Sequence, residues 1–130
     1  MNDNNLKELI QQSFYELLEN PGFDPSRFEY YFSKDYIQHV DGKTMDYAGL
    51  LEHAKTLKSR VKNIKISYEH LIVEGNKVCS VHIVDAMRDN QPVKTKVFAL
   101  FEFENNKIIL CDELTYLMLG EESDRDLGAA

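Results

Sequence analysis

The sequence predicts an α+β fold, in which three N-terminal helices are followed by an antiparallel sheet. Apolar residues recur with the helical period of about 3.6 as far as Val61, and from Ile64 onward they alternate with the period of about 2 that is typical of strands. Short turn sequences separate the later segments, so consecutive strands are expected to pair as hairpins. A run of helices followed by a run of strands is the pattern of α+β proteins.

The first helix is predicted for residues 6–19, because its apolar residues fall on one helix face. The turn residues 20–22 (Asn-Pro-Gly) end it. Asp24 and Pro25 then favour a second, short helix, in which an aspartate cap precedes a proline at the first helical position.

A short strand is predicted for residues 36–40 and is closed by Asp41 and Gly42. Thr44 is the expected cap of the third helix. The buried face of that helix consists of apolar residues at helical spacing: Tyr47, Leu50, Leu51, Ala54, Leu57 and Val61.

Four longer strands follow in meander order. The first contains the alternating residues 64, 66 and 68, and the others cover residues 77–88, 93–104 and 107–119. The chain is therefore expected to be one domain, residues 1–119, followed by an acidic C-terminal tail, residues 120–130, that is solvated and mobile.

Residues 97–101 are apolar on both faces of their predicted strand, so both faces must be covered. The helices can cover one face. A second copy of the chain is the expected cover of the other, because two-fold homodimers are the commonest assemblies. The alternative is that the C-terminal tail covers it.

The composition narrows the class of partner. The formal net charge is -7, so a nucleic-acid-binding surface is not expected. No apolar run approaches the ~20 residues of a membrane span, and the polar N-terminus does not resemble a secretory signal, so a cytoplasmic protein is predicted. Cys79, Cys111 and the histidines lack metal-ligand spacings, and nucleotide-binding motifs are absent, so neither a metal ion nor a cofactor is expected.

Two segments, residues 32–39 (FSKDYIQH) and 106–113 (NKIILCDE), together with the order of elements from Leu6 to Leu119, resemble the nuclear-transport-factor-2-like superfamily in its SnoaL-like branch. The resemblance implies a cone-shaped fold, in which a curved antiparallel sheet wraps around the three helices and leaves one pocket. Members are frequently dimeric. They include ketosteroid isomerases, polyketide cyclases and epoxide hydrolases as well as non-catalytic binding proteins, so the resemblance implies no single function.

A ketosteroid isomerase site does not fit this chain. Matching the elements without gaps places His39 at the position of the isomerase base, and Phe14 and Ala99 at the positions of its two oxyanion donors. Neither a phenyl ring nor a methyl group donates a hydrogen bond, so isomerisation of steroids is not expected.

The same matching implies which side chains face the pocket. We expect it to be lined by apolar, aromatic and weakly polar residues: Phe14, Tyr31, Tyr47, His82, Val97, Ala99, Phe101, Cys111 and Thr115. Either Tyr31 or Tyr47 is the expected hydrogen-bond donor among them. The inward direction of His82 depends on the strand register across residues 89–92.

His39 and Glu113 are the candidate catalytic residues. His39 lies where a strand meets a glycine turn, and histidine can take or give a proton near neutral pH. Glu113 has inward parity among apolar neighbours, where a carboxylate needs a partner, and either His39 or His82 could supply it. The alternatives are that His39 binds a backbone carbonyl beneath the turn and that Glu113 reaches solvent at the rim.

Two functions are compatible with these residues. The first is the binding of a small hydrophobic molecule, with acid-base chemistry of the isomerase, cyclase or hydrolase type at His39 and Glu113. The second is a non-catalytic homodimeric module with a residual pocket, whose convex face or acidic tail contacts a protein. A ligand-sized apolar cavity with converging polar groups favours the first function.

Overall fold

The structure is a computed structural model, and it describes residues 3–121 and 124. Its helices are α1 (Asp3–Phe14), the π-helix η1 (Tyr15–Glu19), α2 (Pro25–Tyr31) and α3 (Tyr47–Arg60). Its strands are β1 (Phe32–Val40), β2 (Lys43–Asp46), β3 (Lys62–Glu74), β4 (Lys77–Arg88), β5 (Gln91–Glu104) and β6 (Lys107–Leu119). None of the helices among the described residues has the length and apolarity needed to cross a bilayer.

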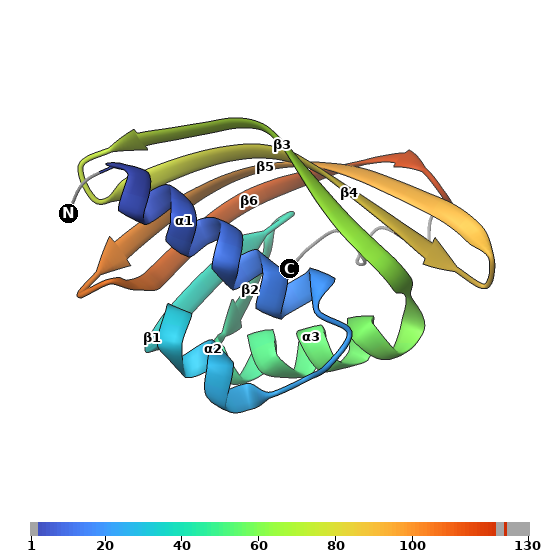
Figure 1. The fold of residues 1–130 in the computed structure, drawn as a ribbon, viewed down its shortest axis with the longest axis horizontal. Coiled ribbons are helices and arrows are strands. Elements are labelled where there is room, and N and C mark those ends of the chain that lie inside the picture. The colour runs from blue at the N-terminus through green and yellow to red at the C-terminus, as the bar shows by residue number, and fades with distance from the viewer. Residues whose placement is uncertain (1–2, 122–123, 125–130) are drawn as a thin grey trace.

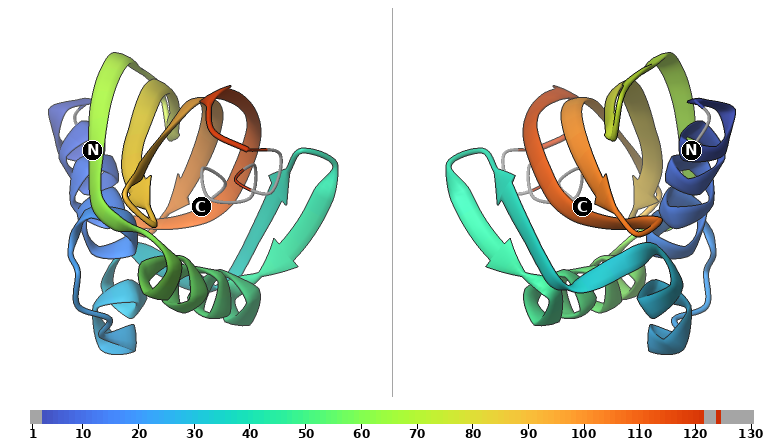
Figure 2. Two further views of the ribbon diagram at one scale, coloured as in Figure 1. Left: turned by 90° about the vertical axis from the view of Figure 1, so that its right-hand side faces the viewer. Right: turned by 90° about the vertical axis from the view of Figure 1, so that its left-hand side faces the viewer.

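The strands form one curved sheet in the order β2-β1-β6-β5-β4-β3 (Figure 1). Neighbouring strands pair antiparallel except β1 and β6, which run parallel, so the sheet is mixed. Figure 2 shows the bend of the sheet, with α1 along β3 and α3 across the open side of the curve. The predicted α+β fold, with a curved sheet wrapped around helices, is confirmed, and the edge strands β2 and β3 do not pair, so the sheet stays open.

The segment before α3 differs from the prediction. Thr44 does not cap the helix, because it lies in β2 and pairs with His39 of β1. The cap is Asp46, whose Oδ1 accepts the backbone N–H of Gly49 at 2.9 Å. Hairpin pairing therefore places the cap later in the chain than the sequence pattern indicated.

One strand is longer than predicted. β1 begins at Phe32, where pairing with β6 also begins, rather than at residue 36. β3 continues to Glu74 through a register shift between Tyr68 and His70. A β-bulge of this kind interrupts the alternation of side chains along the strand.

The concave face of the sheet carries the core. On β5 the inward side chains are all buried: Val93, Thr95, Val97, Ala99, Phe101 and Phe103. They pack against the apolar faces of the helices, where the ring of Phe14 meets that of Phe101 edge to face at 5.6 Å between centres. The predicted inward parity of this strand is correct.

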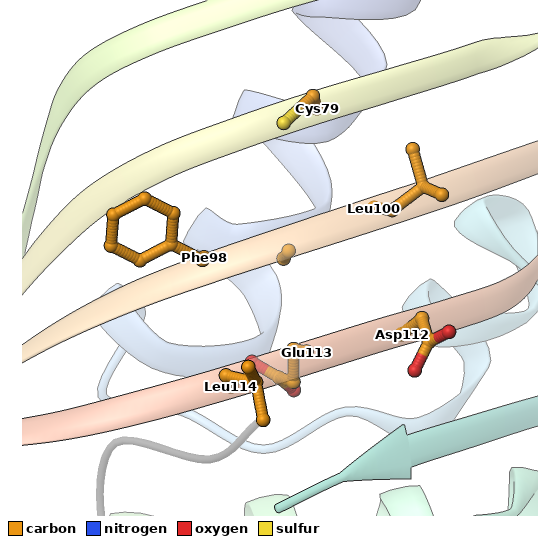
Figure 3. A pocket seen from close by; sticks show the side chains of 7 residues that line it. Cys79, Phe98, Leu100, Asp112, Glu113 and Leu114 are labelled. Carbon is orange, nitrogen blue, oxygen red and sulfur yellow. The ribbon is translucent and has the colours of Figure 1, made fainter.

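The convex face of the same strands is apolar and exposed. Phe98 is 53% exposed and Leu114 is 67% exposed. Figure 3 shows these two side chains with Leu100, Asp112 and Cys79, which together surround an open hollow of about 410 Å³. Both faces of β5 are thus apolar, as the sequence predicted, and the outer face is uncovered in the single chain.

The predicted acidic tail, residues 120–130, lies largely outside the described residues, which include only Gly120, Glu121 and Asp124 of it. The carboxylate of Asp124 is buried and accepts hydrogen bonds from Nε and Nη2 of Arg88, at the end of β4. The backbone N–H of Glu121 donates to the same carboxylate at 2.8 Å. These contacts fix Asp124 against the sheet.

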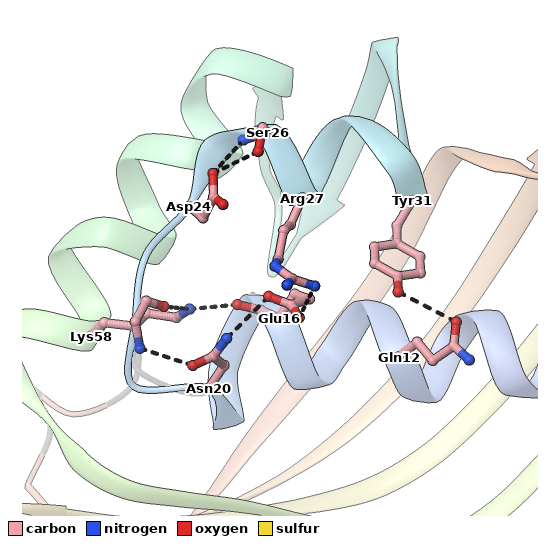
Figure 4. A network of polar contacts seen from close by, with 9 residues as sticks. Gln12, Glu16, Asn20, Asp24, Ser26, Arg27, Tyr31 and Lys58 are labelled. Carbon is pink, nitrogen blue, oxygen red and sulfur yellow. Dashed lines mark hydrogen bonds and ion pairs between the residues drawn. The ribbon is translucent and has the colours of Figure 1, made fainter.

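A polar network ties α3 to the connection between η1 and α2 (Figure 4). The ammonium group of Lys58 donates to the backbone carbonyls of Glu16 and of Gly22. The carboxylate of Glu16 accepts a hydrogen bond from Asn20 at 3.2 Å and pairs with Arg27 at 3.4 Å. Lys58 thus binds the carbonyl end of η1, where the helix dipole favours a cation.

Lys58→Met should weaken this tether. Methionine keeps an aliphatic stem but cannot donate to the two carbonyls, so the free energy of unfolding should fall by about 1–3 kcal/mol in urea denaturation. Lys55→Met is the matched control, because Lys55 is exposed on the same helix, and it should change stability by less than about 0.5 kcal/mol. Equal effects of the two substitutions would contradict the tether.

Candidate functional site

A chain of buried polar side chains links β1 to β6 on the concave side. The hydroxyl of Tyr36 donates to Oε1 of Gln38 at 2.7 Å, and Nε2 of Gln38 donates to Oε1 of Glu113 at 2.7 Å. Tyr36, Gln38 and Glu113 are only 1%, 0% and 4% exposed. Because a buried polar group without a partner costs about 1–3 kcal/mol, these hydrogen bonds are what allow the three side chains to lie in an apolar core.

The parallel pairing of β1 with β6 brings these three polar side chains together. Gln38 lies beside Cys111 in the ladder, and Val40 lies beside Glu113. Side chains alternate between the two faces of a strand, so all four of these side chains point inward and are buried.

The surroundings of Glu113 favour the protonated form of its carboxyl group. Burial raises the pKa of its carboxyl group well above the usual range, and the negative charge of the nearby Asp41 raises the pKa further. Because Oε1 accepts the amide hydrogen of Gln38, the proton is assigned to Oε2. The carboxyl group can therefore donate a hydrogen bond on its Oε2 side.

Tyr36 and Cys111, which face Glu113 from β1 and β6, are uncharged as well. Burial raises the pKa of the Tyr36 hydroxyl and of the Cys111 thiol well above their usual ranges. Glu113 thus lies among neutral groups on its own face of the sheet.

A second buried polar pair lies on β4. Oγ of Ser80 and Nδ1 of His82 are 2.8 Å apart, and both residues are on the inward face, as the predicted register required. The His82 ring lies 4.8 Å from the ring centre of Phe14 and 5.8 Å from that of Tyr68. Burial lowers the pKa of His82 to about 4, so its imidazole is neutral at neutral pH.

The two polar groups lie on the same side of the sheet with a small residue between them. Ala99 of β5 pairs with Ser80 on one side and with Glu113 on the other. Since neighbouring strands are about 4.8 Å apart, Ser80 and Glu113 are separated by about 10 Å across the sheet. Ala99 itself is buried in the core.

His39 does not lie with Glu113. It is exposed on the outer face of β1, where its Nδ1 is 3.0 Å from Oγ1 of Thr44 and where it pairs with Asp112 in the β1–β6 ladder. The expectation that His39 could partner Glu113, which requires the two side chains to share one cavity, is therefore wrong. Neighbouring strand residues point to opposite faces, and Gln38 occupies the inward position.

The remaining predicted pocket residues differ in how deeply they are buried. Five of them are buried in the core: Phe14, Val97, Ala99, Phe101 and Cys111. Thr115 is half-buried at the edge of the site. Tyr31 donates to Gln12 of α1 at 3.4 Å, whereas the buried hydroxyl of Tyr47 has no hydrogen-bond partner among the described residues.

Sequence reasoning missed Tyr36, Gln38 and Asp41. The first two share the inward parity of Val40, so the period of 2 carried a signal for them, but His39 was preferred for its chemistry. Asp41 was assigned only to a turn. Its carboxylate binds Thr115, 74 residues later, and no local pattern indicates that contact.

Four hollows lined by described residues have volumes of about 380 to 520 Å³. Only the convex one reaches the candidate site, through Ala99 and Glu113, and it opens beside Phe98 and Leu114. The single interior pocket that the cone fold implies stays a prediction.

Known proteins of similar sequence and structure point to one family. A family model described as a SnoaL-like domain matches residues 12–110. A protein of Schizosaccharomyces pombe, described as uncharacterized, is 35% identical over 100 residues, which are 76% of this chain and 77% of that protein.

Solved structures share the fold at low sequence identity. AclR of Streptomyces galilaeus superposes with a TM-score of 0.77 at 12% identity, over 99% of this chain and 88% of that one. A LEH-like epoxide hydrolase of M. tuberculosis superposes with a TM-score of 0.67 at 16% identity, over 87% of this chain and 84% of that one.

Glu113→Gln should change how stability depends on pH. Burial raises the pKa of Glu113 in the folded protein above its ordinary value of 4.5 in the unfolded chain, so unfolding releases a proton at pH values between the two. Above that value the free energy of unfolding of the wild type should therefore fall relative to Glu113→Gln, by up to about 1.4 kcal/mol per pH unit. Urea denaturation of both proteins at pH 5 and pH 8 measures the difference.

Asp112→Asn is the control for this measurement, because Asp112 is the exposed neighbour of Glu113 on the same strand. It should keep the pH dependence of the wild type. His82 is present in every protein, so its lowered pKa cancels in the comparison. Parallel pH profiles of the wild type and Glu113→Gln would show that Glu113 is not held in its acid form.

Proposed function

Since the chain belongs to the SnoaL-like domain family, we propose that it binds a small, uncharged hydrophobic molecule on the concave side of its sheet and that Glu113 donates a hydrogen bond or a proton to an oxygen atom of that molecule. The observation that carries this proposal is the neutral carboxyl group that Gln38 holds at 2.7 Å in the core. Burial raises the pKa of this carboxyl group and so favours its hydrogen-bond-donating acid form.

A neutral, buried carboxylic acid is suited to acid catalysis. A carbonyl or epoxide oxygen gains negative charge as its bond breaks, and a donor in a dry site stabilises that charge more than water does. The epoxide hydrolase of M. tuberculosis, which shares the fold, acts on an oxygen of this kind. Reactions of the isomerase, cyclase or hydrolase type would all use such a donor.

The surroundings of Glu113 favour an uncharged ligand. Val97, Ala99 and Phe101 provide an apolar wall beside it, and Phe14 packs on that wall from α1. Tyr36 is neutral, and the nearest charge that affects Glu113 is the negative one on Asp41. An anionic ligand would therefore be repelled, and a hydrophobic one would gain from contact with the wall.

His82 would supply the second polar contact. Its neutral imidazole lies on the inward face of β4, and one nitrogen is already engaged by Ser80. The other nitrogen could accept or donate a hydrogen bond toward a ligand above Ala99. His39 has no part in this proposal, because it lies on the outer face.

A homodimeric module without catalytic activity is the second candidate, and the exposed convex face favours it. Phe98, Leu100, Leu114 and Tyr116 are between 42% and 67% exposed on neighbouring strands. A second copy related by a two-fold axis would cover this apolar surface, and an interface of standard size buries about 800 Å² per partner.

2-Naphthol is a suitable probe of the proposed site, because it is small, aromatic and fluorescent and carries one oxygen. A fluorescence titration should show saturable binding to the wild type. Glu113→Ala should weaken binding at least about tenfold, since the donor is lost, and Glu113→Gln should weaken it less, because the amide still donates. Native mass spectrometry of the purified protein would show a ligand that is retained from the cell.

Asp112→Asn is the matched control, with its substitution on the opposite face of β6, and it should bind 2-naphthol like the wild type. Identical affinities of the wild type and Glu113→Ala would rule out the donor role. If the wild type shows no saturable binding and no retained ligand, the non-catalytic homodimeric module is favoured instead.

Phe98→Glu should prevent dimerisation through the convex face. Light scattering at micromolar concentration should give about twice 15.1 kDa for the wild type and 15.1 kDa for the variant, because burying an unpaired carboxylate in an apolar interface is costly. Tyr30→Glu is the control, since Tyr30 is 66% exposed on α2, and it should remain a dimer. A monomeric wild type would contradict the dimer.

A further inference from the structure

We propose that Asp41, in the turn between β1 and β2, is a positioning residue of this site: its hydrogen bonds fasten that turn to β6 at Glu113 and Thr115 and hold a negative charge at the rim of the site. The inference deepens the proposed function, on which it rests for the use that Glu113 makes of its proton.

Asp41 is held in place by the local geometry of its turn. Val40 pairs with Lys43, so Asp41 and Gly42 form a two-residue hairpin connection. Both have positive φ angles, 51° and 84°, which is the backbone of a type I′ turn. Asparagine and aspartate are the residues that this first position favours, and they accept a positive φ at low cost.

The side chain of Asp41 extends the ladder between β1 and β6 beyond the end of β1. The backbone N–H of Asp41 donates to the carbonyl oxygen of Glu113 at 3.1 Å. Its Oδ1 accepts the backbone N–H of Thr115 at 2.8 Å, and its Oδ2 accepts the hydroxyl hydrogen of Thr115. The carboxylate thus occupies the place of the next strand residue, and β6 is anchored at Glu113 and again two residues later.

The same carboxylate acts on Glu113 through its charge. Burial is the main cause of the raised pKa of Glu113, and Asp41 is the charged group that adds to it. The other titratable groups facing Glu113, Tyr36 on β1 and Cys111 on β6, are neutral, and β5 contributes only Ala99. An ionised Asp41 at the rim therefore opposes ionisation of the acid inside.

This arrangement separates two carboxyl groups into two roles. The carboxylate of Asp41 is exposed and hydrogen-bonded to Thr115, whereas the carboxyl group of Glu113 is buried and accepts the amide of Gln38. Asp41 does not touch the buried ligand site, so it acts through Glu113.

Asp41→Asn removes the negative charge and keeps the hydrogen bonds to Thr115. Asparagine suits the type I′ turn, its Oδ1 can accept the Thr115 N–H, and its amide can donate to the Thr115 hydroxyl. We expect the midpoint of the Glu113 titration to fall by about one pH unit. Carbon-detected NMR of protein labelled at glutamate side-chain carboxyl groups measures it, with Glu113 assigned by its absence in Glu113→Gln.

Asp41→Gly removes both the negative charge and the side-chain hydrogen bonds to Thr115. Glycine adopts the positive φ of this position without strain. The Glu113 midpoint should fall as in Asp41→Asn, and hydrogen exchange of the Thr115 amide should speed up at least about tenfold. Asp41→Asn should keep that amide protected. Thr115→Val, which removes one hydrogen bond and no charge, and Asp112→Asn, on the other face, should both leave the Glu113 midpoint unchanged.

Two results would overturn the inference: an unchanged Glu113 midpoint in Asp41→Asn, or a Thr115 amide that stays equally protected in Asp41→Gly. Both measurements use the unliganded full chain, so they are independent of ligand binding. Failure of 2-naphthol to bind would remove the proposed function and leave the role of Asp41 to be judged by the titration. Normal 2-naphthol binding with an unchanged midpoint would remove only the role of Asp41.

Discussion

The parallel pairing of β1 with β6 is the interaction on which the rest of the structure depends. It joins the first strand of the chain to the last, and it brings Gln38 within 2.7 Å of Glu113 although the two are 75 residues apart in sequence. Closing so long a loop costs conformational entropy that only the completed sheet offsets. The β1–β2 hairpin pairs with the rest of the sheet only through β6, so the site and the curved shape form together.

That pairing also places a carboxyl group where it reduces stability. An apolar residue at position 113 would fill the same space without ionising in the unfolded chain. Four other buried residues of the core are also polar, although apolar side chains would stabilise the fold as well: Tyr36, Gln38, Ser80 and His82. Sequences depart from what folding alone favours mainly at functional sites. The buried polar row is therefore consistent with the proposed ligand site.

The sequence predicted the fold well and the site only in part, for a physical reason. Periodicity reports which face a residue is on, and it correctly placed Glu113 on β6, Ala99 on β5 and His82 on β4. It reports nothing about distant contacts. His39 was chosen for its chemistry against the parity of its own strand, which instead favoured Gln38, and the lock between Asp41 and Thr115 depends on the β1–β6 pairing, which local sequence does not encode.

The proposed ligand site and the proposed dimer interface lie on opposite faces of the same strands, β5 and β6, so each affects the other. Ala99 and Glu113 belong to the inward row, yet they also line the floor of the convex hollow between Phe98 and Leu114. The sheet is one residue thick there, so a second copy seated on the convex face would also remove water from the outer side of the strand that carries Glu113. Desolvation is the main cause of its raised pKa, so covering that face would favour the acid form still more. The proposed dimer and the proposed acid form of Glu113 would therefore support each other.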